Sequence, residues 1–295
     1  MTDTSDEWCK EHKEYDSVLH YSEAKEILRL FLINNKQFEV VNNFFCGEFL
    51  YYVYRHKVLF QEYQNFWSST IQNKNETDID TASALENRLL LFSMCIDNVS
   101  IEAYKIQNNT TAMHLLYHIS YLLLLITGTF DSLAWIINNL YGLGFEVKKR
   151  QQIDLINKDF RKAVKLKSPL LHNLLSEISF INKVEAIREL RDRIVHRNFI
   201  ETISSGDKDK RKDYLWIDQT ASDKLIKAGF EEKYYFMKHE DLNAIDILGF
   251  LRYLQMTTIN IVDCFLKCIS NEIYHTADVY SIWKMLRFPA EPYVL

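Results

Sequence analysis

One short segment of the chain combines residue types that could cleave a phosphodiester bond. The segment reads Arg191-Asp192-Arg193-Ile194-Val195-His196. An imidazole exchanges protons near neutral pH, and a guanidinium stabilises the charge that builds on phosphorane oxygens. Together they suit cleavage of RNA by its own 2′-hydroxyl, a reaction that requires no metal ion. We therefore interpret Arg191 and His196 as candidate catalytic residues, and we expect no metal and no cofactor.

The segment is expected on a helix that runs from Ser179 to about Arg197. At about 100° per residue, Arg191 falls inside the apolar stripe of this helix and His196 falls outside it. A guanidinium on a core-facing stripe needs an acceptor or a solvated cleft, because an unpaired buried charge is costly. Asp192 stands one turn before His196 and could orient the imidazole and raise its pKa. The stripe consists of Phe180, Val184, Ile187, Leu190, Ile194 and Val195.

An ordinary solvated helix explains the same residues in another way. Opposite charges recur three and four residues apart, which is typical of an exposed helix surface. The spacing of one arginine and one histidine also arises easily by chance, so its surroundings must support it. The charged residues in question are Glu185, Arg188, Glu189, Asp192, Arg193 and Arg197.

With these residues in view, the segment Leu190–Arg197 resembles the signature of the HEPN superfamily. That signature is an arginine, a polar residue, a few further residues and a histidine, near the end of a helix in a bundle. The long helix before the motif holds Asp131 in an apolar setting, and one more long helix follows, as the resemblance requires. The resemblance extends over residues 81–275 as a likeness of fold, while its specific part is the hexapeptide.

The resemblance implies a metal-independent endoribonuclease, a common activity in toxin and defence systems. It implies catalytic roles for Arg191 and His196, with Asp192 as the polar residue beside them and Asp131 as a supporting partner. It also implies RNA as a partner, a homodimer, and a neutralising or regulatory protein. Because one site holds a single titratable group, symmetric pairing of two motif helices would supply a second one. Other members serve as inactive RNA-binding or protein-binding modules, and this alternative stays open.

A basic segment offers a second candidate for contact with RNA. Residues 148–167 hold eight basic and two acidic side chains in a chain whose net charge is −5. They could follow an RNA backbone, although a solvated basic helix face explains them equally well. The candidates are Lys148, Lys149, Arg150, Arg161, Lys162 and Lys165.

Two further pairs of residues have helical spacing that could hold a metal. His114 and His118 are one turn apart, but no third ligand is evident near them, so we interpret them as core or cleft histidines. Cys264 and Cys268 lie on an apolar helix and are interpreted as core residues.

Composition predicts the fold class and the cellular setting. Seven glycines and three prolines in 295 residues are few, which favours long helices over sandwiches and barrels. Five scattered cysteines indicate reduced thiols, and the acidic start of the chain does not resemble a secretory signal. The most apolar stretch, residues 121–130, ends at Asp131 before it reaches membrane-spanning length. We expect a cytoplasmic protein without membrane contact.

The order of elements predicts an all-α helical bundle with one small insertion. A polar segment, residues 72–80, separates an N-terminal helical extension (1–80) from a HEPN-like bundle (81–275), and residues 276–295 form a C-terminal tail. Long helices are expected from Asp80 or Thr81 to about Ile106, from Thr111 to about Tyr141, and from Glu240 to about His275. Between the motif helix and the last helix, the aromatic runs 214–217 and 234–237 could pair as a short β-ribbon.

Overall fold

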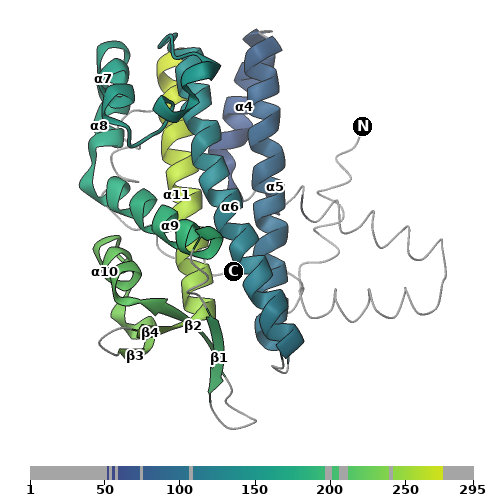
Figure 1. Cartoon of the computed structure of the whole chain (residues 1–295). Helices are drawn as coiled ribbons and strands as arrows, with labels where there is room; N and C mark the ends of the chain where they lie inside the picture. The colour runs from purple at the N-terminus through teal and green to yellow at the C-terminus, as the bar shows by residue number, and fades with distance from the viewer. Residues whose placement is uncertain are drawn as a thin grey trace, which may run out of the picture.

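The protein is mostly helical, as the sequence predicts. The computed structural model describes residues 52, 55, 56, 59–73, 76–105, 109–196, 201–205, 212–238 and 242–274 of the 295. Four helices run side by side and a layer of further helices and strands covers them on one flank (Figure 1). The four are α4 (Gln61–Asn73), α5 (Glu76–Tyr104), α6 (Asn109–Leu140) and α11 (Ile247–Tyr274).

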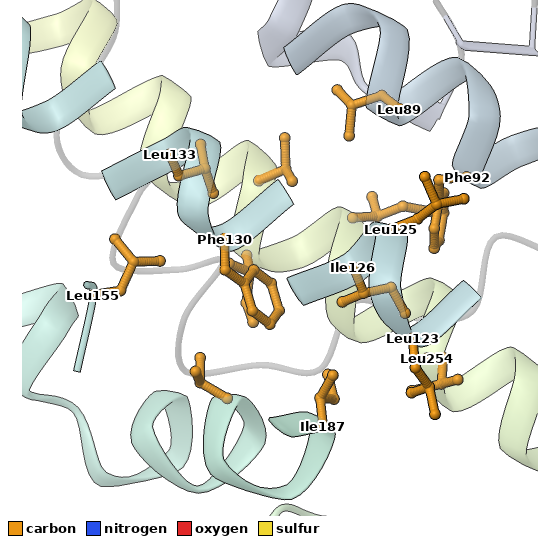
Figure 2. Close-up of a cluster of buried hydrophobic side chains, with 14 of the residues drawn as sticks. Leu89, Phe92, Leu123, Leu125, Ile126, Phe130, Leu133, Leu155, Ile187 and Leu254 are labelled. Atoms are coloured by element: carbon orange, nitrogen blue, oxygen red, sulfur yellow. The ribbon is translucent and has the colours of Figure 1, made fainter. Parts of the chain in front are cut away.

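Helix α6 is the central member of the bundle, and its composition explains why. It is apolar on most of its circumference, so it is stable only where neighbours surround it. Phe130 is fully buried and points toward α9, while Ile187 of α9 points back toward it (Figure 2). Leu89 and Phe92 of α5 lie on the opposite side of α6 (Figure 2). All elements of the bundle share this core.

Helix α6 ends within one residue of the end expected from the sequence, about Tyr141. The helix ends at Leu140, and Gly142 follows with a φ of 56°, a left-handed conformation that glycine adopts at little cost. By length and composition α6 could cross a membrane, but 72% of its most apolar window is buried inside the structure. A buried core helix passes the same test of length and composition.

Three short helices lead from α6 to the motif helix α9 (Ile178–His196). They are the 3₁₀ helix Val147–Gln152, α7 (Lys158–Lys167) and α8 (Pro169–Ser176). Asn157 caps α7, because its side chain accepts hydrogen bonds from the amides of Asp159 and Phe160. Ser168 caps α8 through the amide of Leu171, and Pro169 occupies the first turn, where its missing N–H costs nothing.

A small α/β insertion separates α9 from α11. It consists of β1 (Glu201–Ser205), β2 (Lys212–Asp218), α10 (Gln219–Lys227), a 3₁₀ turn (Glu232–Tyr234), β3 (Tyr235–Lys238) and β4 (Leu242–Asp246). The strands form an antiparallel sheet in the order β1-β2-β4-β3. Leu215, Ile217 and Ile245 join the sheet to the common core.

The predicted pairing of the two aromatic runs is wrong in its partners. The runs form β2 and β3, but β4 lies between them and pairs with both. The last helix, expected from Glu240, begins at Ile247, and residues 242–246 form β4 instead. The two runs still meet above the sheet, since the rings of Tyr214 and Phe236 stack with their centroids 4.2 Å apart. Two strands that the sequence pattern did not predict, β1 and β4, therefore turn the expected ribbon into a four-stranded sheet.

The expected boundary at residues 72–80 falls between α4 and the first turns of α5. Helix α5 begins at Glu76, earlier than the predicted cap at Asp80 or Thr81. Phe66 of α4 is buried in the same core as Leu85 of α5 and Phe265 of α11. Within the described residues, α4 therefore packs as part of the bundle. Residues 1–51 of the predicted extension and the whole of the predicted tail lie outside the described residues.

Candidate functional site

The motif helix α9 packs one face against α6, and Arg191 lies at the edge of that face. Val184, Ile187 and Leu190 are buried on the stripe predicted from the sequence, and Ile194 packs partly against the core. The Arg191 side chain is 33% exposed, so it is neither buried nor free in solvent. A side chain at the border of core and solvent can hold a fixed charge toward a ligand.

Arg191 and Asp192 form an ion pair at this border. Arg191 Nε lies 2.9 Å from Asp192 Oδ1, although Nε is buried and the contact lacks hydrogen-bond geometry. Asp192 is 53% exposed, and a pair of this kind adds little stability. The expected role of Asp192 as an orienter of His196 stays a prediction, because His196 is the last residue of α9 and its side chain lies outside the described residues.

Asp131 of α6 lies beside this face of α9. Arg188 Nη2 lies 3.9 Å from Asp131 Oδ1, and Arg188 Nη1 donates a hydrogen bond of 2.6 Å to Asp154 Oδ2. Arg188 stands one turn before Arg191, so both guanidinium groups face the same surface. Two of the residues that the sequence selected, Asp131 and Arg191, therefore belong to one charged cluster.

The electrostatics of Asp131 identify the other members of the cluster. Desolvation raises the pKa of Asp131 above its ordinary value, and Arg188 opposes this rise most strongly. Asp154 adds to the rise, whereas Arg191 and Arg88 of α5 act against it. Because the Asp131 side chain is 61% exposed, water reaches the cluster. We call Arg88, Asp131, Asp154, Arg188 and Arg191 the arginine cluster.

Arg193 corrects the interpretation of α9 as a helix with one solvated face. Its side chain is 8% exposed and pairs with Glu189 at 2.7 Å and with Asp218, the cap residue of α10. Lys224 of α10 reaches Glu189 at 2.5 Å, which together with Arg193 lowers the pKa of Glu189. The insertion covers this face of α9, so Glu189, Arg193, Asp218 and Lys224 form an ion-pair network that joins α9 to the insertion. An exposed helix would have no such network.

The basic segment touches the arginine cluster only through Asp154, which accepts the hydrogen bond from Arg188, and its helix α7 lies farther away. Figure 1 shows α7 near the N-terminal end of α9, whereas Arg191 stands near the C-terminal end. Lys148, Arg150 and Lys165 are exposed, and Lys162 is exposed beside Asp159 at 3.6 Å. Arg161 is half-buried, and its Nε is buried without a hydrogen-bond partner. The side chain of Lys149 lies outside the described residues.

The structure also places the two pairs of residues that were considered as metal ligands. Cys264 and Cys268 are buried and free, as predicted, and burial raises the pKa of Cys264 to about 12. His114 is 58% exposed, contrary to a core position, and lies 3.9 Å from Glu102. Among the described residues, no three His, Cys, Asp or Glu side chains form a group that could hold a metal ion.

Sequence reasoning missed Arg88, Arg188 as a site residue, and Asp154. Arg188 had a local signal, because it shares a helix face with Arg191 three residues later. Arg88 and Asp154 had none, since α5 and the segment before α7 come beside α9 only through tertiary packing. The sequence also gave no sign of Asp263, a buried carboxyl on α11 whose pKa desolvation, together with nearby Glu62, raises to about 8.

Comparisons of the chain with protein-family models, with curated proteins and with solved structures found no match. The resemblance to the HEPN superfamily therefore depends on the residues of the motif and their helical setting.

Proposed function

We propose that this protein is a metal-independent endoribonuclease of HEPN type, with a role in defence or as a toxin. His196 acts as the general acid or base, and Arg191 stabilises the phosphorane. The observation that carries the proposal is the position of Arg191, a partly exposed arginine near the end of a helix that packs against the core, beside Asp131 and Arg188. Such a site can bind a phosphate without a metal.

In the proposed reaction, the 2′-hydroxyl of the RNA loses its proton to a base and attacks the adjacent phosphorus. The bond from phosphorus to the 5′-oxygen breaks, and that oxygen receives a proton. The products are a 2′,3′-cyclic phosphate and a 5′-hydroxyl end. One imidazole can serve as base or acid, so a symmetric homodimer that brings a second His196 to the site would supply the other group.

The basic segment would extend the contact with RNA in this proposal. Lys148, Arg150, Lys162 and Lys165 are exposed and could follow the RNA backbone away from the cleavage site. Lys149 and Arg161 belong to the same proposed track. A regulatory or neutralising protein would bind over the same surface.

The test is cleavage of mixed RNA in excess chelator by the wild-type protein and by His196→Ala. We expect cleavage by the wild type, cyclic phosphate ends on the products, and a loss of about 100-fold or more in the variant. His114→Ala is the matched control, since His114 is exposed on α6 and is no part of the site. Equal cleavage by His196→Ala and the wild type would refute the proposal.

A second outcome would identify the inactive alternative. If neither protein cuts RNA while both bind it with the same affinity, the chain is an RNA-binding module. Cleavage that requires a divalent metal ion would replace the proposed chemistry with a different one.

A further inference from the structure

Arg88 reaches the arginine cluster across a gap in the side chains of α6. Its guanidinium lies directly over Gly128, where a Cβ atom would overlap Nη1 and stand 3.1 Å from Cζ. Glycine in the middle of a long helix is unfavourable, so a close approach of another group is the usual reason to find it there. Gly128 is thus the opening that lets an α5 arginine lie against the α6 backbone.

The gap at Gly128 places Arg88 on the same side of α6 as Asp131, the carboxylate that faces α9. Gly128 and Asp131 are three residues apart on α6 and therefore share one helix face. Arg88, Arg188 and Arg191 all act on the charge of Asp131, from two different helices. Three arginines therefore surround one exposed carboxylate, Arg188 at 3.9 Å and Arg88 over the glycine one turn before it.

Arg88 differs from the other two arginines in its partners. Arg188 donates a short hydrogen bond to Asp154, and Arg191 is paired with Asp192. In the part of the chain that the structure describes, Arg88 has no hydrogen bond and no ion pair within 4 Å, although its side chain is half-buried. A half-buried guanidinium with unused donors has the largest gain to make from an incoming anion.

We propose that Arg88 binds an RNA backbone phosphate next to the one held by Arg191, with Gly128 as the gap that admits its side chain. This inference rests on the proposed function and names the substrate feature that the site recognises, the phosphodiester backbone of single-stranded RNA. Asp131 holds the arginines in place before substrate arrives, and the phosphate takes over part of its role.

The test measures binding of a 2′-deoxy oligonucleotide, which carries the phosphates but cannot be cleaved by this chemistry. Fluorescence anisotropy at several salt concentrations compares the wild type with Arg88→Gln, Gly128→Ala and the double variant. We expect each single variant to weaken binding about tenfold. We also expect each to flatten the dependence of log affinity on log salt by about 0.7. Arg252→Gln, an exposed arginine on α11, is the control and should bind normally.

The double variant tests whether Gly128→Ala acts on binding only through the position of Arg88. Because the alanine methyl acts only by displacing Arg88, Gly128→Ala should have no further effect once Arg88 is glutamine. Alanine is also the better helix former, so a loss of binding in Gly128→Ala cannot come from a weakened α6. Additive losses, or unchanged binding in Arg88→Gln, would overturn the inference.

The binding experiment on Arg88 and the cleavage experiment on His196 can succeed or fail independently. If RNA is not cleaved but oligonucleotide binding depends on Arg88, the phosphate site stands and the nuclease proposal fails. If RNA is cleaved through His196 while Arg88→Gln binds and cuts normally, the nuclease stands and Arg88 is no part of its site.

Discussion

The two faces of α9 carry arginines in contrasting settings only two residues apart. Arg193 is 8% exposed and fixed by Glu189 and Asp218, which join α9 to the insertion. Arg191 is 33% exposed on the bundle side, in a cluster that water reaches. The first arrangement satisfies its charge within the fold, whereas the second leaves donors available. We therefore expect the face with Arg193 to contribute mainly to stability, and we propose the face with Arg191 as the one that binds a ligand.

The largest expected difference between the faces is in stability. Arg193→Met leaves two partly buried carboxylates without their shared partner, and we expect a loss of about 3 kcal/mol in the free energy of unfolding. Arg191→Met removes a partly exposed pair and should cost less than about 1 kcal/mol. Urea unfolding followed by circular dichroism measures both. Equal losses for the two variants would remove the distinction between the faces.

A smaller effect should appear in the pH dependence of stability. The hydrogen bond from Lys224, with Arg193, holds the pKa of Glu189 below its ordinary value of 4.5. A lowered carboxyl pKa stabilises the fold above the unfolded pKa, and this stabilisation disappears as pH falls through the folded pKa. Glu189→Gln should therefore cost about 1.5 kcal/mol near pH 7 and progressively less below pH about 4.5.

The matched control for this measurement is Glu185→Gln. Glu185 is exposed one turn earlier on the same helix, and the variant should unfold like the wild type at every pH. If Glu189→Gln lowered the free energy of unfolding by the same amount from pH 7 to pH 3, the charge of Glu189 would not contribute to the contact between α9 and the insertion.

The smallest expected effect concerns the open face. Asp131→Asn removes a negative charge from among three arginines, so oligonucleotide affinity should rise about threefold. Stability should stay within about 0.5 kcal/mol, because the side chain is mostly exposed. Anisotropy titrations give the affinity, with Asp223→Asn on the insertion as the control. Weaker binding in Asp131→Asn would mean that the carboxylate contributes more by positioning the arginines than it costs by repulsion.

The helical part of the fold could be predicted because its signals are local. Ser168-Pro169 starts α8 and Gly142 follows α6, since a cap or a left-handed turn depends on neighbouring residues alone. The stripe of Val184, Ile187 and Leu190 likewise gave the buried face of α9 correctly. By contrast, the pairing of β2 with β4 joins segments far apart in the chain, and no local pattern specifies it.

The same division applies to the candidate site. The sequence by itself determined the motif, its place at the end of a helix, and the helix face that Arg191 borders, because residue type and helical period are properties of a single segment. Only the tertiary structure decided that Arg193 is buried, since the covering insertion folds back from residues that follow. It alone brought Arg88 through the gap at Gly128 to Asp131, because contact between α5, α6 and α9 depends on how three helices pack.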